Sequence, residues 1–262
     1  MKKINLINTQ TINKNIYVIE LSNPSKRNPL SLSLLKILQK ELDSLKKNKT
    51  VKVVIIQSTG PSFSSGHDLK EVRSTSSSSK NLLNLFKVCS KLMLSIRKLP
   101  QPVIASVDGV AAAAGCQLVA SCDLAFASKS SFFQTPGVNI GLFCSTPMVA
   151  ISRKILPKDM MYMLLTGDKI SAKAAQEMKL INKVFSKNSL KSEVLKIASM
   201  LSEKSNQSII IGKEAFYQQL DMQIEEAYKY TSMIMTKNMA LMDAKEGINA
   251  FLEKRKPKWK TN

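Results

Sequence analysis

The stretch from Pro102 to Asp123 constrains the fold most, because a strand pattern, a glycine turn and a helix pattern follow one another without interruption. Its β-branched start predicts a short buried strand, and Asp108-Gly109 predicts the turn that ends it. The small residues from Ala111 to Gly115 allow close backbone approach. A helix that begins near Ala114 would present free N–H groups to a developing negative charge. The same composition is compatible with a small-residue helix packed in a core.

A second segment, residues 51–70, contains another motif that bears on the fold. The apolar strand Val51 to Gln57 leads into Phe-Ser-Ser-Gly-His-Asp-Leu-Lys at residues 63–70. With Asp-Gly-Val-Ala-Ala-Ala-Ala-Gly-Cys-Gln at residues 108–117, this motif resembles the enoyl-CoA hydratase/isomerase (crotonase) superfamily. The likeness continues through Thr166 to Ala172 and ends with Ala250 to Pro257, so it covers about residues 16–259.

The resemblance implies an α/β fold, the crotonase spiral, in which successive ββα turns stack as a right-handed superhelix. It also implies a C-terminal helical region that packs subunits into a homotrimer, often paired as a hexamer. We therefore predict that residues 1–200 form an acyl-CoA-binding spiral core. Residues 201–262 are then the helical trimerisation region.

Periodicity along the chain predicts the individual elements. Strands are expected at residues 15–21, 51–57, 103–107 and 124–127. Helices are expected from Ser31, with Leu34, Leu35, Leu38, Leu42 and Leu45 on one face, and at 81–98, 172–178, 190–201 and from 209 onward. The serine run 74–79 predicts a mobile surface loop, and 137–147 predicts a loop that leads into a helix at 148–155.

The chain is strongly basic, with a formal net charge of +20 from 39 Lys+Arg against 19 Asp+Glu. Such an excess favours an anionic partner, which includes nucleic acid and the phosphates of coenzyme A. With 44% hydrophobic residues, the composition is typical of a soluble globular protein of one or two domains. Gln117 and Asp123 interrupt the most apolar window, so we expect no membrane span.

Four cysteines and one histidine limit the redox and metal chemistry. The cysteines form no Cys-x-x-Cys pair, and His67 alone cannot complete an ordinary zinc ligand set, so we expect no metal and reduced thiols. Met1 to Lys14 has no signal-peptide core and is short and arginine-free for a mitochondrial presequence. The family resemblance nevertheless suggests a mitochondrial protein, with the cytosol as the alternative.

The resemblance implies that the backbone N–H groups of His67 and Ala114 bind the acyl oxygen of a CoA thioester. Each such donor is worth roughly 2.7–4 kcal/mol when it is aimed at a developing oxyanion. Ala114 replaces the family's usual glycine, which keeps the donor and adds a methyl group. The imidazole of His67 as a general acid is the alternative role for this residue.

The positions that carry acids or bases in the family lack carboxylates here. The two hydratase glutamates correspond to Gln117 and Gly137, and a third position, an aspartate in other members, corresponds to Ser145 beside Cys144. An amide does not titrate and glycine has no side chain, so neither is a general base. We therefore expect hydratase or isomerase turnover to be absent or very slow.

Coenzyme A, as its thioester, is the expected ligand, and no permanently bound cofactor is expected. The resemblance places contacts to it at two sets of positions: Ser65, Asp68, Leu69 and Lys70 in the His67 loop, and Phe251 and Lys254 in the C-terminal helix. Lys70 and Lys254 to Lys256 would meet its phosphates. Asp68 is expected to cap the loop rather than act as a base.

Two other functions stay open. A CoA-thioester lyase, decarboxylase or hydrolase would use the oxyanion hole with a carboxylate from elsewhere, such as Glu71 or Asp108. An RNA-binding homologue would use a lysine row on the first helix, where Lys36 and Lys40 lie one turn apart, although Leu32 replaces the first lysine of the row in the RNA-binding relative.

Overall fold

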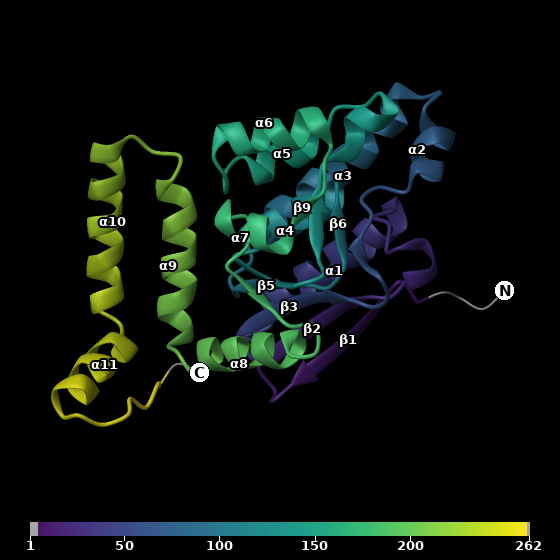
Figure 1. The fold of residues 1–262 in the computed structure, drawn as a ribbon. Helices are drawn as coiled ribbons and strands as arrows, with labels where there is room; N and C mark the ends of the chain where they lie inside the picture. The colour runs from purple at the N-terminus through teal and green to yellow at the C-terminus, as the bar shows by residue number, and fades with distance from the viewer. Residues whose placement is uncertain (1–4, 261–262) are drawn as a thin grey trace.

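The computed structural model describes residues 5–260 and contains two β-sheets in its core (Figure 1). The large sheet has the order β1 (Ile7–Ile12), β2 (Ile16–Leu21), β3 (Val53–Ser58), β5 (Val103–Val107), β7 (Leu124–Ser128) and β10 (Lys183–Phe185). The small sheet has the order β4 (Ser62–Ser64), β6 (Val110–Ala112), β8 (Phe132–Gln134) and β9 (Ile170–Ser171).

Consecutive strands enter the two sheets in turn, and this alternation produces a spiral. β3, β5 and β7 pair in parallel in the large sheet, while the strand after each of them, β4, β6 and β8, pairs in parallel in the small sheet. Helices follow each strand pair: α2 (Leu69–Thr75) and α3 (Ser79–Arg97), then α4 (Ala114–Ser121), then α5 (Ser145–Ile151) and α6 (Pro157–Thr166). The chain is therefore a series of stacked ββα turns, as predicted.

Both faces of the large sheet are covered. Alternate residues along its strands enter two separate apolar clusters, because successive side chains of a strand point to opposite faces. On one face lie α1 (Leu32–Lys47), α3 and α4, and on the other lies α8 (Leu190–Ser202). The five predicted leucines of α1 are all buried, and the Ser31 hydroxyl accepts a hydrogen bond from the N–H of Leu34, which confirms the predicted cap.

Several predicted boundaries were wrong. The serine run is not one loop: Ser74 and Thr75 end α2, only residues 76–78 form a turn, and Ser79 begins α3. The predicted helix at 148–155 begins three residues earlier, at Ser145, and ends at Ile151. A 3-10 helix, Pro136–Ile140, lies inside the predicted loop. The strands β1, β4, β6, β8, β9 and β10 and the helices α2 and α6 were missed, while α7 (Ala172–Glu177) was predicted.

The last three helices stand apart from the sheets (Figure 1). α9 (Asn206–Gln219), α10 (Ile224–Met239) and α11 (Met242–Leu252) expose large apolar side chains, which include Phe216, Leu220, Ile224, Tyr228, Met235 and Phe251. The division of the chain at residue 200 stays a prediction, and α8 ends two residues beyond it. Within residues 5–260, no helix is both long and apolar enough to cross a membrane.

A buried ion pair joins α9 to the spiral. The ammonium of Lys213 lies 2.6 Å from Oδ2 of Asp123 and also donates to the carbonyls of Ile96 and Gln101. The other oxygen of Asp123 accepts a hydrogen bond from the Tyr217 hydroxyl at 2.9 Å. Every N–H of the ammonium therefore has an acceptor, as a buried charge requires.

Candidate functional site

The His67 loop and the first turn of α4 meet beside the small sheet. β4 and β6 are parallel neighbours, so the segments that leave their carboxyl ends lie side by side. Gly66 makes the approach possible: it adopts φ +86°, and a Cβ on it would lie 3.2 Å from the amide nitrogen of Ala114. Only glycine occupies such a position without strain.

The N–H groups of His67 and Ala114 have no acceptor among the residues that the structure describes. The first intrahelical bond of α4 runs from the N–H of Gln117 to the carbonyl of Ala113, which leaves the N–H of Ala114 free. Two free donors on adjacent segments can bind one oxygen atom. A pair of free donors is what an oxyanion-binding site requires.

The peptide that carries the Ala114 donor is held in a strained conformation. Ala113 has φ 47° and ψ −115°, a region that non-glycine residues rarely occupy. The ψ angle of Ala113 sets the direction of the next peptide plane and therefore of the Ala114 N–H. Sequence analysis noted the missing glycine at Ala114 and overlooked that Ala113 carries the strain.

We expect Ala113→Gly to raise the free energy of unfolding by about 1 kcal/mol. Relief of the strained φ/ψ is worth roughly 1–3 kcal/mol and outweighs the roughly 0.5–1 kcal/mol of entropy that glycine costs. Urea unfolding of the variant measures the change. Ala111→Gly is the matched control, because Ala111 is fully buried in β6 without a positive φ, and this variant should lose stability. An Ala113→Gly variant that is less stable than the parent protein would contradict the inference that the Ala113 backbone is strained.

The imidazole of His67 lies against protein rather than in open solvent. Nδ1 lies 3.1 Å from the carbonyl oxygen of Leu30, to which it donates, and the ring makes an edge contact with Phe86 at 5.5 Å between centroids. Burial lowers the pKa of His67, and Nε2 is buried without a hydrogen-bond partner. These contacts favour a neutral imidazole that supports the loop, over a general acid.

The neighbouring acidic residues of the loop cap helices. Oδ1 of Asp68 accepts hydrogen bonds from the N–H groups of Lys70 and Glu71, so Asp68 caps α2 as expected. Oε2 of Glu71 accepts from the N–H of Leu32 at the start of α1. Oδ1 of Asp108 accepts a hydrogen bond from the Ser128 hydroxyl, and Oδ2 forms an ion pair with Lys187 at 3.6 Å. Glu71 and Asp108, the two carboxylates considered for the lyase alternative, are therefore both engaged in contacts within the protein.

Gln117 lies one turn after Ala114 and lines a cavity of about 730 Å³. The cavity is bounded by α3, α4, α5 and α9. The side chain of Gln117 is buried, and its Oε1 lies 4.0 Å from Sγ of Cys89. The carboxamide can therefore orient a bound group by hydrogen bonds but cannot exchange protons with it.

Gly137 and Ser145 lie in and after the 3-10 helix. A Cβ on Gly137 would lie 2.8 Å from the carbonyl oxygen of Leu142 and 3.0 Å from Sγ of Cys144, so no side chain fits there unless the loop moves. Ser145 is the first residue of α5 and is exposed. Burial raises the pKa of the Cys144 thiol, which disfavours a thiolate nucleophile.

The residues predicted to contact coenzyme A form two groups, and within a single subunit the two groups lie far apart. Ser65 lies in the His67 loop, whereas Leu69 and Lys70, both exposed, are the first two residues of α2. Phe251 lies in the last turn of α11 and Lys254 follows that helix. α11 lies on the side of the molecule opposite α2 (Figure 1).

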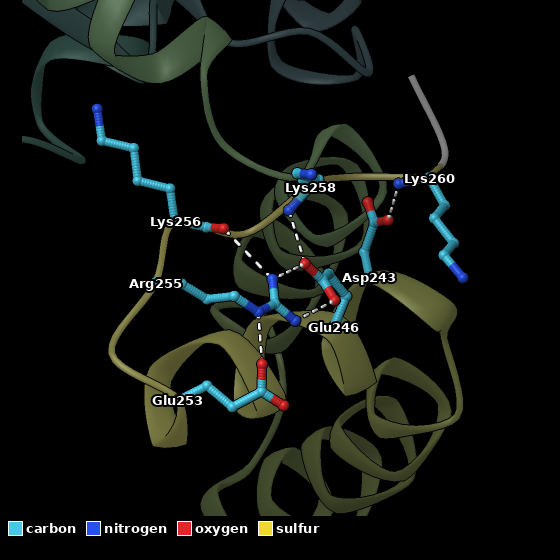
Figure 2. A network of polar contacts seen from close by, with 7 residues as sticks. All are labelled: Asp243, Glu246, Glu253, Arg255, Lys256, Lys258 and Lys260. Carbon is cyan, nitrogen blue, oxygen red and sulfur yellow. Dashed lines mark hydrogen bonds and ion pairs between the residues drawn. The ribbon is translucent and has the colours of Figure 1, made fainter.

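A polar network fixes the basic tail after α11 (Figure 2). The guanidinium of Arg255 binds both carboxylate oxygens of Glu246, at 2.6 and 3.0 Å, and also pairs with Glu253. The hydrogen bond from Arg255 is the main reason that the pKa of Glu246 falls to about 2. The ammonium of Lys256, which is exposed, extends away from this network (Figure 2).

The end of the cavity away from Gln117 was not predicted from the sequence. Arg97, Lys154 and Tyr217 meet there from three separate segments, and no motif spans them. Lys36 and Lys40, the candidates for an RNA contact, are exposed on α1. The described part of the chain contains no group of three or more His, Cys, Asp or Glu side chains that could hold a metal ion.

Known proteins share this fold over nearly the whole chain. The enoyl-CoA hydratase/isomerase family model matches residues 11–262. Human "Enoyl-CoA hydratase domain-containing protein 3, mitochondrial" is 50% identical over 241 residues, which are 92% of this chain and 79% of that protein. Its crystal structure superposes with a TM-score of 0.93 at 47% identity and covers 97% of this chain and 100% of the other. A Mycobacterium smegmatis enoyl-CoA hydratase superposes with a TM-score of 0.95 at 40% identity and covers 97% and 99%. These likenesses confirm the predicted crotonase fold.

Proposed function

The chain belongs to the enoyl-CoA hydratase/isomerase family, and from this premise we propose that it binds acyl-CoA thioesters with the N–H groups of His67 and Ala114 at the acyl oxygen. The observation that carries the proposal is the pair of free backbone donors on adjacent segments. The cavity beside Gln117 is the place for the acyl chain. Lys70 is the contact for a phosphate group.

We propose further that the site has little or no hydratase activity. Hydration of an enoyl thioester needs a group that takes a proton from water, and Gln117 and Gly137 supply none. Loss of a positioned acid or base costs a factor of about 10² to 10⁴ in rate. Ser145 is exposed, and its hydroxyl donates to the Phe143 carbonyl at 3.4 Å; within residues 5–260 it has no hydrogen bond to a side chain that could act as its base.

We also propose that the chain acts in fatty-acid metabolism and assembles as a homotrimer or hexamer. The exposed apolar side chains of α9 to α11 support assembly, since an apolar surface of this extent is unusual on a monomer. In an assembly, Phe251 and Lys254 of one subunit would complete the coenzyme A site of another. The mitochondrial names of the relatives support a mitochondrial location.

Binding and turnover are measured on the same purified protein. We expect calorimetry to detect butyryl-CoA and crotonyl-CoA binding. We expect mass spectrometry after incubation in heavy water to find both esters unchanged, with no added water and no deuterium at Cα. Rapid hydration would contradict the second half of the proposal, and CO₂ loss from a malonyl-type ester would favour the lyase or decarboxylase alternative.

A pair of glycine variants tests the donors. Gly66→Ala should weaken butyryl-CoA binding at least tenfold, because the new Cβ meets the Ala114 amide and separates the two donors. Gly141→Ala is the matched control: Gly141 also has a positive φ, but no atom lies within 4 Å of its Cβ position, so binding should persist. Equal binding by both variants would remove the assigned oxygen site.

A further inference from the structure

The cavity beside Gln117 is not uniformly apolar. Its middle is walled by the apolar side chains Met93, Leu94, Ala120, Val149 and Ala150. Beyond them the lining is basic, with Arg97, Arg153 and Lys154 and only one carboxylate, Asp221. A plain hydrocarbon chain would fill the middle and would make no charged contact with this basic end.

The basic end lies at the carboxyl end of α4, away from the oxyanion donors. Gln117, in the first turn of α4, lies beside Cys89 of α3, and Arg97 follows two turns later on α3. The charge of Asp123, just after α4, acts on Lys154. With a rise of 1.5 Å per residue, the helix separates Ala114 from Ser121 by about 10 Å. An acyl chain of medium length spans this interval.

Lys154 makes no close ion pair within residues 5–260. Burial lowers its pKa, because desolvation disfavours the charged form. Among residues 5–260 its ammonium has no hydrogen bond or ion pair, and it lies 5.7 Å from the centre of the Tyr217 ring. Asp123 acts on Lys154 only at longer range and partly offsets the effect of burial, while its oxygens contact Lys213 and Tyr217 directly.

Arg97 meets the same aromatic ring. Its Cζ lies 4.8 Å from the centre of the Tyr217 ring, and its guanidinium also contacts Asp221 at 3.2 Å. The lining at this end has three basic side chains and one carboxylate, that of Asp221, so its net charge is positive. A carboxylate that reached this end would find charge-assisted hydrogen-bond donors in a partly desolvated setting.

We propose that the acyl group bound here ends in a second carboxylate, which Lys154 and Arg97 bind, so that the preferred ligand is a medium-chain dicarboxylic acyl-CoA. This proposal rests on the proposed function, because it takes the thioester to lie at His67 and Ala114. It adds the substrate class that the family resemblance does not give.

Calorimetry with matched ligands tests the proposal. Adipoyl-CoA and hexanoyl-CoA have the same chain length and differ only in the terminal carboxylate, as do suberoyl-CoA and octanoyl-CoA. We expect the dicarboxylic member of at least one pair to bind about tenfold more tightly, as a charge-assisted hydrogen bond allows. Tight but equal binding within both pairs overturns the inference and leaves the proposed function standing. Binding of neither member overturns both.

Lys154→Met identifies the group responsible. This variant should lose the preference for the dicarboxylic ester and keep its affinity for hexanoyl-CoA, which also shows that it is folded. Lys158→Met is the matched control, since Lys158 is an exposed lysine of α6 outside the cavity, and it should keep the preference. If Lys154→Met weakens both esters equally, or weakens neither, the assignment of the carboxylate to this end of the cavity is wrong.

Discussion

Replacement of Lys213 by methionine is expected to lower the free energy of unfolding by about 3–5 kcal/mol. The ammonium has three acceptors, and the side chains of Lys213 and Asp123 are only 9% and 15% exposed. Methionine has a similar length but no charge, so the Asp123 carboxylate would remain buried without its ammonium partner, and within residues 5–260 the Val103 N–H and the Tyr217 hydroxyl would be its donors. Urea unfolding at neutral pH measures the loss.

Two comparisons separate this effect from a general loss of lysine. Lys213→Met combined with Asp123→Asn should recover much of the stability, because the stranded charge is then gone. Lys196→Met removes an exposed partner of Glu193, at 2.7 Å and 71% exposure, and should change stability by less than about 1 kcal/mol. A Lys213→Met variant as stable as Lys196→Met would refute the role of the pair.

Alanine at Gly115 is expected to destabilise the protein by about 2–3 kcal/mol, although alanine is the better helix former. Gly115 lies in the first turn of α4, where a Cβ would be 2.5 Å from the backbone oxygen of Ser64 in β4. This oxygen belongs to the small sheet and cannot withdraw as a flexible side chain would. Either α4 or the His67 loop must shift.

The same substitution elsewhere should have the opposite sign. Gly212 lies in the middle of α9 with no atom within 4 Å of its Cβ position, so Gly212→Ala should stabilise by roughly 0.5–1 kcal/mol. Denaturant unfolding of the two variants side by side gives a direct comparison. If both stabilise, the close approach of α4 to β4 does not exist as described.

The elements that sequence analysis found share strong local signals. The five leucines and the serine cap of α1 fixed that helix, and β-branched runs located β2, β3 and β5. β7 was also predicted, although its five residues include none that is β-branched. The small sheet was missed because β4, β6 and β8 have only three residues each, too few to show a period. Pro157 at the first position of α6 was an available signal that went unused.

The candidate site was predictable only where sequence motifs carry it. The positions of His67, Ala114 and Gln117 followed from the two loop motifs, and their roles remain proposals. The strain at Ala113 depends on how β6 enters α4, which no local preference of alanine reveals. The basic end of the cavity joins α3, α9 and the segment after α5, so only the tertiary fold brings Arg97 and Lys154 to one ring.

The packing around Gly137 limits which side chains a mutation can introduce at this position. A one-step mutation to glutamate would push its first carbon into the Leu142 carbonyl and the Cys144 sulfur, so the variant would lose stability before it gained an acid. A carboxylate at this place therefore requires a different course of the 137–144 loop. Engineering an acid into this protein is then a matter of loop design, and a single side-chain exchange will not achieve it.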